Sequence, residues 1–122
     1  MQRVLVPLFC VTGLTLGCST VSQGIDIAPL RPPYKVTVYE NGHPVAEREI
    51  SAGSDEADLI VQWLAANRSG WTSTPATYAP HRLVSGDSFS LNFGEEQCVL
   101  NHGGRQLYKK GDMSGLSQVF DK

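Results

Sequence analysis

The residues best suited to act as a nucleophile and its base are a cysteine and a histidine four positions apart, Cys98 and His102. A thiol beside an imidazole supports acyl transfer when the two side chains are within hydrogen-bond reach. The residues around them form a strand-like run, which places both side chains on one face but about 13 Å apart along it. The spacing therefore excludes a catalytic dyad made of these two residues alone.

The spacing of the histidines and glycines predicts no metal or nucleotide site. Histidines stand at 43, 81 and 102, and the chain has neither a Cys-x-x-Cys nor a His-x-x-x-His pair. The pair Gly103-Gly104 is not followed by the Gly-Lys-Ser/Thr of a phosphate-binding loop. We therefore expect no metal and no cofactor.

Two pairs of carboxylates, Glu47/Glu49 and Glu95/Glu96, belong to the residue type that hydrolyses glycosides. We expect the first pair on an edge strand and the second at a hairpin turn, both exposed. A general acid needs apolar surroundings that raise its pKa, and neither place supplies them. The sequence thus predicts that the protein is not an enzyme, and a small hydrolase is the least favoured alternative.

The block Gly86-Asp87-Ser88 resembles the motif that carries the nucleophilic serine in a family of lipases and esterases. That family also supplies an Asp-x-x-His near the C-terminus, whereas this chain has no such motif and is too short for the family's fold. Glycine, aspartate and serine are the usual residues of turns. We interpret the block as a polar turn that opens a strand.

The N-terminal residues resemble a targeting signal. Met1-Gln2-Arg3 precede an uncharged, largely apolar run that ends at Cys18. The run is shorter than the roughly 20 residues of a membrane span but suits a secretory signal. Its end, Leu14-Thr15-Leu16-Gly17-Cys18, resembles the lipobox of bacterial lipoprotein precursors, although Thr15 stands where the family most often carries leucine. The alternative is a buried N-terminal strand or helix with an incidental cysteine.

The lipobox resemblance implies a signal peptide at residues 1–17 and lipidation of Cys18, for example with palmitate. Because each buried methylene contributes ~0.8 kcal/mol, several acyl chains would anchor the protein almost permanently in a membrane. Ser19, rather than Asp, after the cysteine resembles the outer-membrane class. The implied location is the bacterial cell envelope, with the protein anchored in the outer membrane and facing the periplasm.

Residues 18–33 are expected to form the lipidated cysteine and a flexible tether. Residues 19–33 show no sustained period, include three prolines, and would reach about 50 Å if fully extended. Removal of the signal and acylation of Cys18 would leave Cys98 as the remaining thiol, so no intramolecular disulfide could form. Its apolar neighbours favour a buried, structural cysteine.

Residues 34–122 are predicted to form a single domain that begins with a hairpin and a helix. The alternating runs at 34–40 and 43–50 flank Asn41-Gly42, which is typical of a type I′ turn. Glu40 would then face His43, and Tyr39 would face Pro44, with the returning strand at the sheet edge. A helix is expected over 55–70, with Ile60, Trp63 and Leu64 on its buried face.

The rest of the chain completes an α+β fold. After an irregular segment from Trp71 to Pro80, the pattern from His81 to Lys110 predicts three or four antiparallel strands. A short C-terminal helix starting at Asp112 would align one apolar stripe, namely Met113, Leu116, Val119 and Phe120. This order predicts an antiparallel sheet covered on one face by the long helix, in two layers.

The charge of the chain limits the kinds of partner that it can bind. The chain has 122 residues and a formal net charge of −2, too close to neutrality for a dedicated nucleic-acid binder. Acids dominate positions 40–58, and Arg105, Lys109 and Lys110 cluster later, so either two opposite faces or a balanced surface results.

The irregular segment carries the candidate binding residues, Trp71, Tyr78 and His81. Aromatic residues on loops between rigid elements often anchor a partner. The alternative is that these aromatic residues close the edge of the core. The leading hypothesis is a membrane-anchored, non-enzymatic protein-binding module, for example an inhibitor or immunity-type factor. The alternative function is a structural accessory subunit of an envelope or secretion assembly.

Overall fold

The computed structural model describes residues 22–120, so the lipobox and Cys18 lie outside the described residues. Within that range the chain is mainly β, with one antiparallel sheet and two short helices, which agrees with an α+β class. The strands run in the order β3-β2-β5-β6-β7-β8-β4. The elements are β2 (Tyr34–Glu40), β3 (His43–Ile50), α1 (Asp55–Ala66), β4 (Thr72–Ser73), β5 (Arg82–Ser85), β6 (Phe89–Phe93), β7 (Gln97–His102), β8 (Arg105–Lys110), the 3-10 turn η3 (Ser114–Leu116) and α2 (Ser117–Phe120).

The predicted hairpin is confirmed. Asn41 and Gly42 adopt φ values of 53° and 79°, as a type I′ turn requires. Glu40 pairs with His43 and Tyr39 with Pro44. The register shifts beyond this pair. Val38 pairs with Ala46, so Val45, which lies between Pro44 and Ala46, has no partner on β2. β3 occupies the end of the sheet, as expected of an edge strand that carries a proline.

The first helix, α1, forms where the sequence predicts a helix but ends earlier. The hydroxyl of Ser54 accepts a hydrogen bond from the backbone N–H of Ala57 at 3.2 Å and caps the start. The side chain of Asn67 donates to the Trp63 carbonyl at 2.8 Å, and Asn67 is the C-terminal cap. The expected end near Gly70 was therefore wrong by about one turn. The predicted apolar face is buried and comprises Ala57, Ile60, Trp63 and Leu64.

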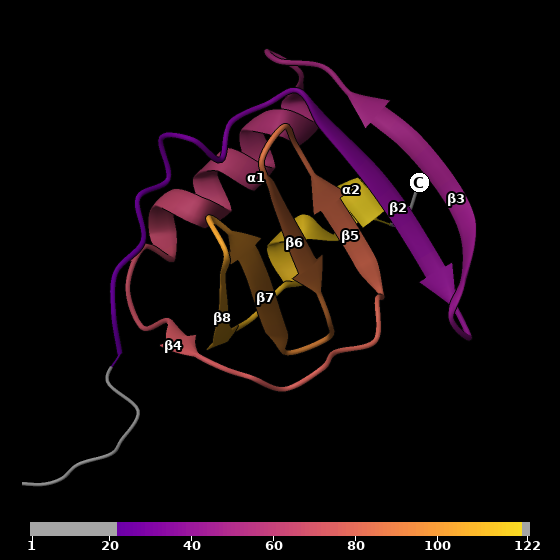
Figure 1. Cartoon of the computed structure of the whole chain (residues 1–122). Coiled ribbons are helices and arrows are strands. Elements are labelled where there is room, and N and C mark those ends of the chain that lie inside the picture. Colours follow the sequence, from indigo (N-terminus) through magenta and orange to yellow (C-terminus); the bar gives the residue numbers. More distant parts are fainter. Residues whose placement is uncertain (1–21, 121–122) are drawn as a thin grey trace, which may run out of the picture.

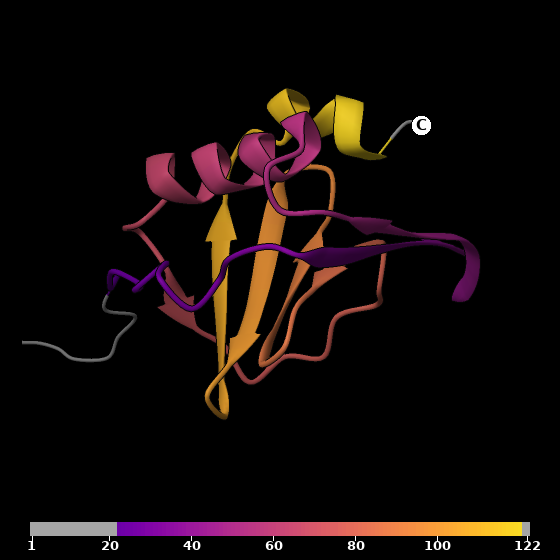
Figure 2. The same cartoon turned by 90° about the horizontal axis from the view of Figure 1, so that it is seen from above.

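The strand register separates the two faces of the sheet. One row across the strands consists of Val36, Val84, Leu91, Leu100 and Leu107, all buried. Figures 1 and 2 show α1 lying along this face, with η3 and α2 beside it. Trp63 packs edge-on against Phe93 with ring centroids 5.0 Å apart. The predicted C-terminal stripe is buried in the same core, at Met113, Leu116, Val119 and Phe120.

The expectation of a flexible tether is wrong for residues 22–33. Gln23 forms an antiparallel bridge with Trp71, and the Ile25 N–H donates to the Arg68 carbonyl at 2.8 Å. Leu30 is buried in the core and accepts a hydrogen bond from the buried Tyr34 hydroxyl at 2.8 Å. Ile25, Ile27 and Leu30 supply the apolar surface that holds this proline-containing segment on the domain. The sequence did not predict this packing, because these residues show no helical or strand period.

The segment after α1 is also more ordered than its sequence suggests. Thr72 and Ser73 form β4, which pairs antiparallel with β8. This strand was not predicted, because two residues are too few to show a period. Beyond it, residues 74–81 cross the sheet face opposite to α1 and are called the strap below.

Candidate binding surface

The structure separates the three residues that the sequence grouped as a binding loop. Trp71 is 0% exposed, its ring packs edge-on against Trp63 at 6.2 Å, and its indole N–H donates to the Asn67 carbonyl at 2.6 Å. The expectation of an exposed anchor at Trp71 is therefore wrong. The alternative holds, because the turn at Gly70 (φ 85°) leads directly into a residue that closes the core.

Tyr78 lies on the strap and is half-buried. Its ring stacks on that of Tyr108, with centroids 5.9 Å apart and planes 21° apart. Its hydroxyl shares a hydrogen bond with the Thr74 hydroxyl at 3.0 Å. Both of these contacts are within the domain, so Tyr78 holds the strap in place. Only the part of its side chain that stays exposed is open to a partner.

Side chains from two strands bind the strap along its length. The amide of Asn92 accepts from the His81 N–H at 3.0 Å and donates to the Ala79 carbonyl at 2.9 Å. On β8, the amide of Gln106 donates to the carbonyls of Thr74 and Ala76. Beneath the strap lies Val99, which pairs with Asn92 and Tyr108 and is only 2% exposed. The strap therefore covers an apolar position on the second face of the sheet.

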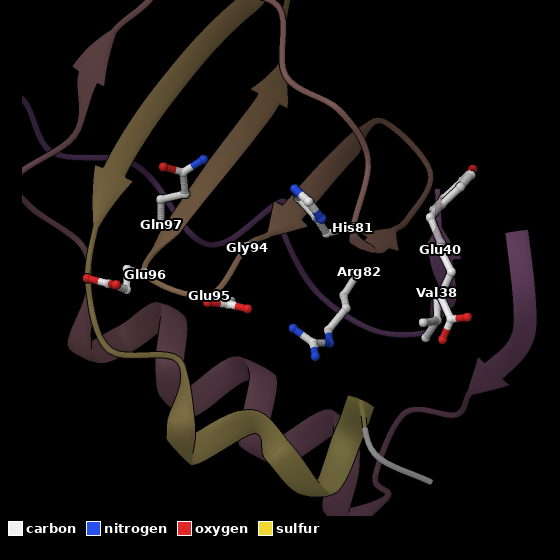
Figure 3. A pocket seen from close by; sticks show the side chains of 9 residues that line it. Val38, Glu40, His81, Arg82, Gly94, Glu95, Glu96 and Gln97 are labelled. Carbon is white, nitrogen blue, oxygen red and sulfur yellow. The ribbon is translucent and has the colours of Figure 1, made fainter. Parts of the chain in front are cut away.

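His81 is the predicted site residue that remains exposed. It lines a hollow of about 460 Å³ at the end of β2, the start of β5 and the turn before β7. Figure 3 shows Arg82 extending between Glu95 on one side and Val38 and Glu40 on the other. The Arg82 guanidinium also lies 5.6 Å from the centre of the Phe120 ring. Sequence reasoning missed this hollow, because its lining residues meet only through strand pairing.

The hollow is lined by side chains of both charge signs. Its polar groups are carboxylates, an imidazole and a guanidinium, so it offers both signs of charge to a polar partner. An adjoining hollow of about 250 Å³ shares Arg82 and Glu95 and is lined in part by Phe120. Within residues 22–120, no group of three or more histidine, cysteine or acidic side chains is placed to hold a metal ion.

The two nucleophiles considered from the sequence, Cys98 and Ser88, do not line this hollow. Cys98 is fully buried, and burial raises the pKa of its thiol well above the usual value. His102 does not serve it, since the His102 Nδ1 lies 3.1 Å from the Ser88 carbonyl. The Gly86 N–H donates to the Phe89 carbonyl at 3.1 Å, so the Gly-Asp-Ser block forms the expected turn. Burial raises the pKa of Tyr34 to about 12, which keeps its phenol protonated.

The edge strand β3 is the most exposed element of the sheet. It pairs with β2 on one side, and no other strand of residues 22–120 pairs with it. Seven of its eight residues are exposed or intermediate, and Val45, beside the register shift, is 54% exposed. Glu47 forms an ion pair with Lys35 at 3.3 Å. The opposite sheet edge, β4, is only two residues long.

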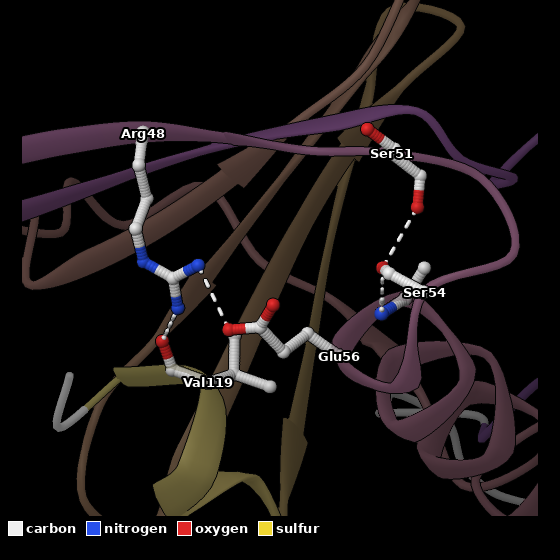
Figure 4. Close-up of polar contacts among 6 residues, drawn as sticks. Arg48, Ser51, Ser54, Glu56 and Val119 are labelled. Carbon is white, nitrogen blue, oxygen red and sulfur yellow. Dashed lines mark hydrogen bonds and ion pairs between the residues drawn. The ribbon is translucent and has the colours of Figure 1, made fainter.

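A polar clamp holds this edge against the helices. The Arg48 guanidinium forms an ion pair with Glu56 on α1 at 2.9 Å and also donates to the Val119 carbonyl on α2 (Figure 4). Arg48 faces the core side, because it pairs with the buried Val36. The clamp fixes the position of β3 relative to both helices and leaves the outer edge of the strand open.

No helix within residues 22–120 is both long and apolar enough to cross a membrane. Comparison of the chain with models of protein families, with curated proteins and with solved structures finds no significant match.

Proposed function

We propose that this chain is a lipid-anchored, non-enzymatic protein-binding module of the bacterial cell envelope, built as a two-layer α+β domain. The N-terminal residues up to Cys18 support the anchor through their resemblance to a lipobox. The burial of Trp71 and the internal bonding of the strap move the binding surface away from the Trp71–His81 loop. The edge of β3, with the hollow near His81 as a secondary contact, takes its place.

The observation that carries this proposal is the open edge of β3. An eight-residue edge strand offers a row of backbone donors and acceptors to an added strand of a partner. The clamp at Arg48 fixes the strand in advance, so little conformational entropy is lost on binding. Pro44 and the charged residues of β3 reduce non-specific pairing between edges, which suits a strand that is open to one selected partner.

Site-specific photocrosslinking in the envelope tests the binding surface. A photoreactive amino acid at Val45 on β3 should crosslink one discrete protein. Val61, the exposed valine on α1, provides the matched control and should not. Equal crosslinking from both positions, or none from Val45, would overturn the proposal. A soluble enzyme as the partner would indicate an inhibitor or immunity-type factor, whereas a membrane complex would indicate an accessory subunit.

The anchor is tested separately by metabolic labelling with palmitate. The parent chain should incorporate the label, and Cys18→Ala should not. The domain should still fold in this variant, because the core of the described residues begins at Leu30 and does not need the lipid. Label retained in Cys18→Ala would refute the lipobox assignment.

A further inference from the structure

The chain enters the domain at the end opposite to the hairpin turn. In both views the first described residues lie beside β4, and the turn between β2 and β3 lies across the molecule (Figures 1 and 2). The bridge between Gln23 and Trp71 and the hydrogen bond from Ile25 to Arg68 fix this entry point. The first described residues therefore lead into the domain at the end near β4, and the hairpin turn lies at the other end.

Three cations from distant parts of the sequence gather around the entry point. Arg68 follows α1, and its carbonyl binds the Ile25 N–H. Arg105 on β8 donates to the side-chain oxygen of Gln23. Lys109, also on β8, donates to the Ser69 carbonyl at 2.7 Å. Asp26 lines a small hollow with Arg105 and offsets one of these charges, so the three cations remain in excess over it.

The opposite end of the domain is acidic. Glu40, Glu47 and Glu49 are exposed on the hairpin, and Lys35 pairs with one of them. Arg48 adds little positive charge there, because its guanidinium is held by Glu56. The hairpin end thus keeps a small excess of acids even with Arg82 beside Glu40, whereas the entry point carries an excess of bases.

The ordered N-terminal segment also shortens the link to the proposed anchor. Gln23 follows Cys18 by five positions, which span at most about 18 Å. A free tether up to residue 33 would have allowed about 50 Å. A lipid on Cys18 would keep the basic end near the headgroups, where charges interact over a Debye length of about 8–10 Å.

We propose that the basic end of the domain, formed by Arg68, Arg105 and Lys109, docks on the anionic headgroups of the membrane that holds the lipid anchor. The β3 edge then points away from the membrane, toward its partner. This inference rests on the lipid anchor of the proposed function. Each cation near an anionic bilayer strengthens association by roughly fivefold, so the three together give about a hundredfold.

The orientation is testable on the acylated full chain reconstituted in vesicles of phosphatidylcholine with and without phosphatidylglycerol. A fluorophore is attached at Ala66→Cys, near the basic end, or at His43→Cys, near the hairpin turn; both positions are exposed. Lipids with a nitroxide headgroup serve as quenchers. We expect quenching of the Ala66→Cys label that depends on phosphatidylglycerol and fades with salt, and none of the His43→Cys label.

Two double variants test whether docking depends on these particular cations or only on the net charge of the protein. Arg68→Gln/Arg105→Gln should weaken docking by about twenty-fivefold. Arg31→Gln/Lys35→Gln removes the same charge from other surfaces and should leave docking unchanged. Quenching that ignores lipid charge, or that falls equally in both double variants, overturns the inference while the anchor stands. A Cys18 without an acyl group by mass spectrometry overturns the proposed function and this inference together.

Discussion

Replacing Trp71 by alanine tests whether the segment after α1 begins in the core. The side chain is fully buried, donates to the Asn67 carbonyl at 2.6 Å and packs edge-on against Trp63. Truncating a buried aromatic costs about 3–5 kcal/mol, and the carbonyl left without its donor adds about 1 kcal/mol. We therefore expect the free energy of unfolding to fall by about 4–6 kcal/mol, most of the stability of many small domains.

Urea unfolding followed by far-ultraviolet circular dichroism measures this loss without relying on tryptophan fluorescence. Trp71→Phe is the second variant, because it keeps a buried ring and loses only the indole donor and some volume, about 1–3 kcal/mol. Tyr78→Ala is the comparison on the strap and should cost less than Trp71→Ala, since Tyr78 is only half-buried. A Trp71→Ala protein within about 0.5 kcal/mol of the parent would show that Trp71 is an exposed residue.

Three further predictions concern the strap, the buried thiol and acid stability. Asn92→Ala leaves the His81 N–H and the Ala79 carbonyl without their partner, so the free energy of unfolding should fall by about 2–4 kcal/mol and proteases should cut the strap faster; unchanged cleavage would contradict its role. Thiol reagents should label Cys98 only after denaturation, because the thiol is buried and its pKa is raised; fast labelling of the native protein would refute this. Hydrogen bonds from the backbone and side chain of Ser114 lower the pKa of Asp112 below its usual 3.8, so the stability it contributes is present above that value and is lost as pH falls through the folded pKa. Asp112→Asn should therefore flatten the acid limb of the stability profile, and superimposable profiles would exclude this contribution.

Local patterns were enough to predict the elements that organise themselves over short distances. The Asn41-Gly42 turn and the alternation on both sides of it predict the first two pairs of the hairpin, with Pro44 at a sheet edge, but not the register shift beyond Tyr39. The helix face at Ile60, Trp63 and Leu64 follows from a 3.6-residue period. The turn at Gly86 could be recognised from residue type alone.

Features that depend on pairing across the chain could not be predicted in this way. The strap looks irregular because its hydrogen bonds go to side chains of other strands, Asn92 and Gln106, which lie 13 and 32 positions from the residues they bind. Residues 22–33 look like a tether because their partners, Trp71 and Arg68, lie more than forty residues later. The basic end has the same origin, since Arg68 meets the cations of β8 only in the folded sheet.

The contacts that residues 22–33 make with the domain also affect how the protein responds to a pulling force. If the chain is held at its N-terminus by a lipid, as proposed, a force that pulls the domain from the membrane first loads the contacts of Gln23 and Ile25. These contacts can open in succession, whereas the sheet begins only at Tyr34. Peeling residues 22–33 would release about 40 Å of chain before any strand of the sheet is strained. The segment would thus act as a reserve of length that absorbs tension while the edge of β3 stays folded and able to bind.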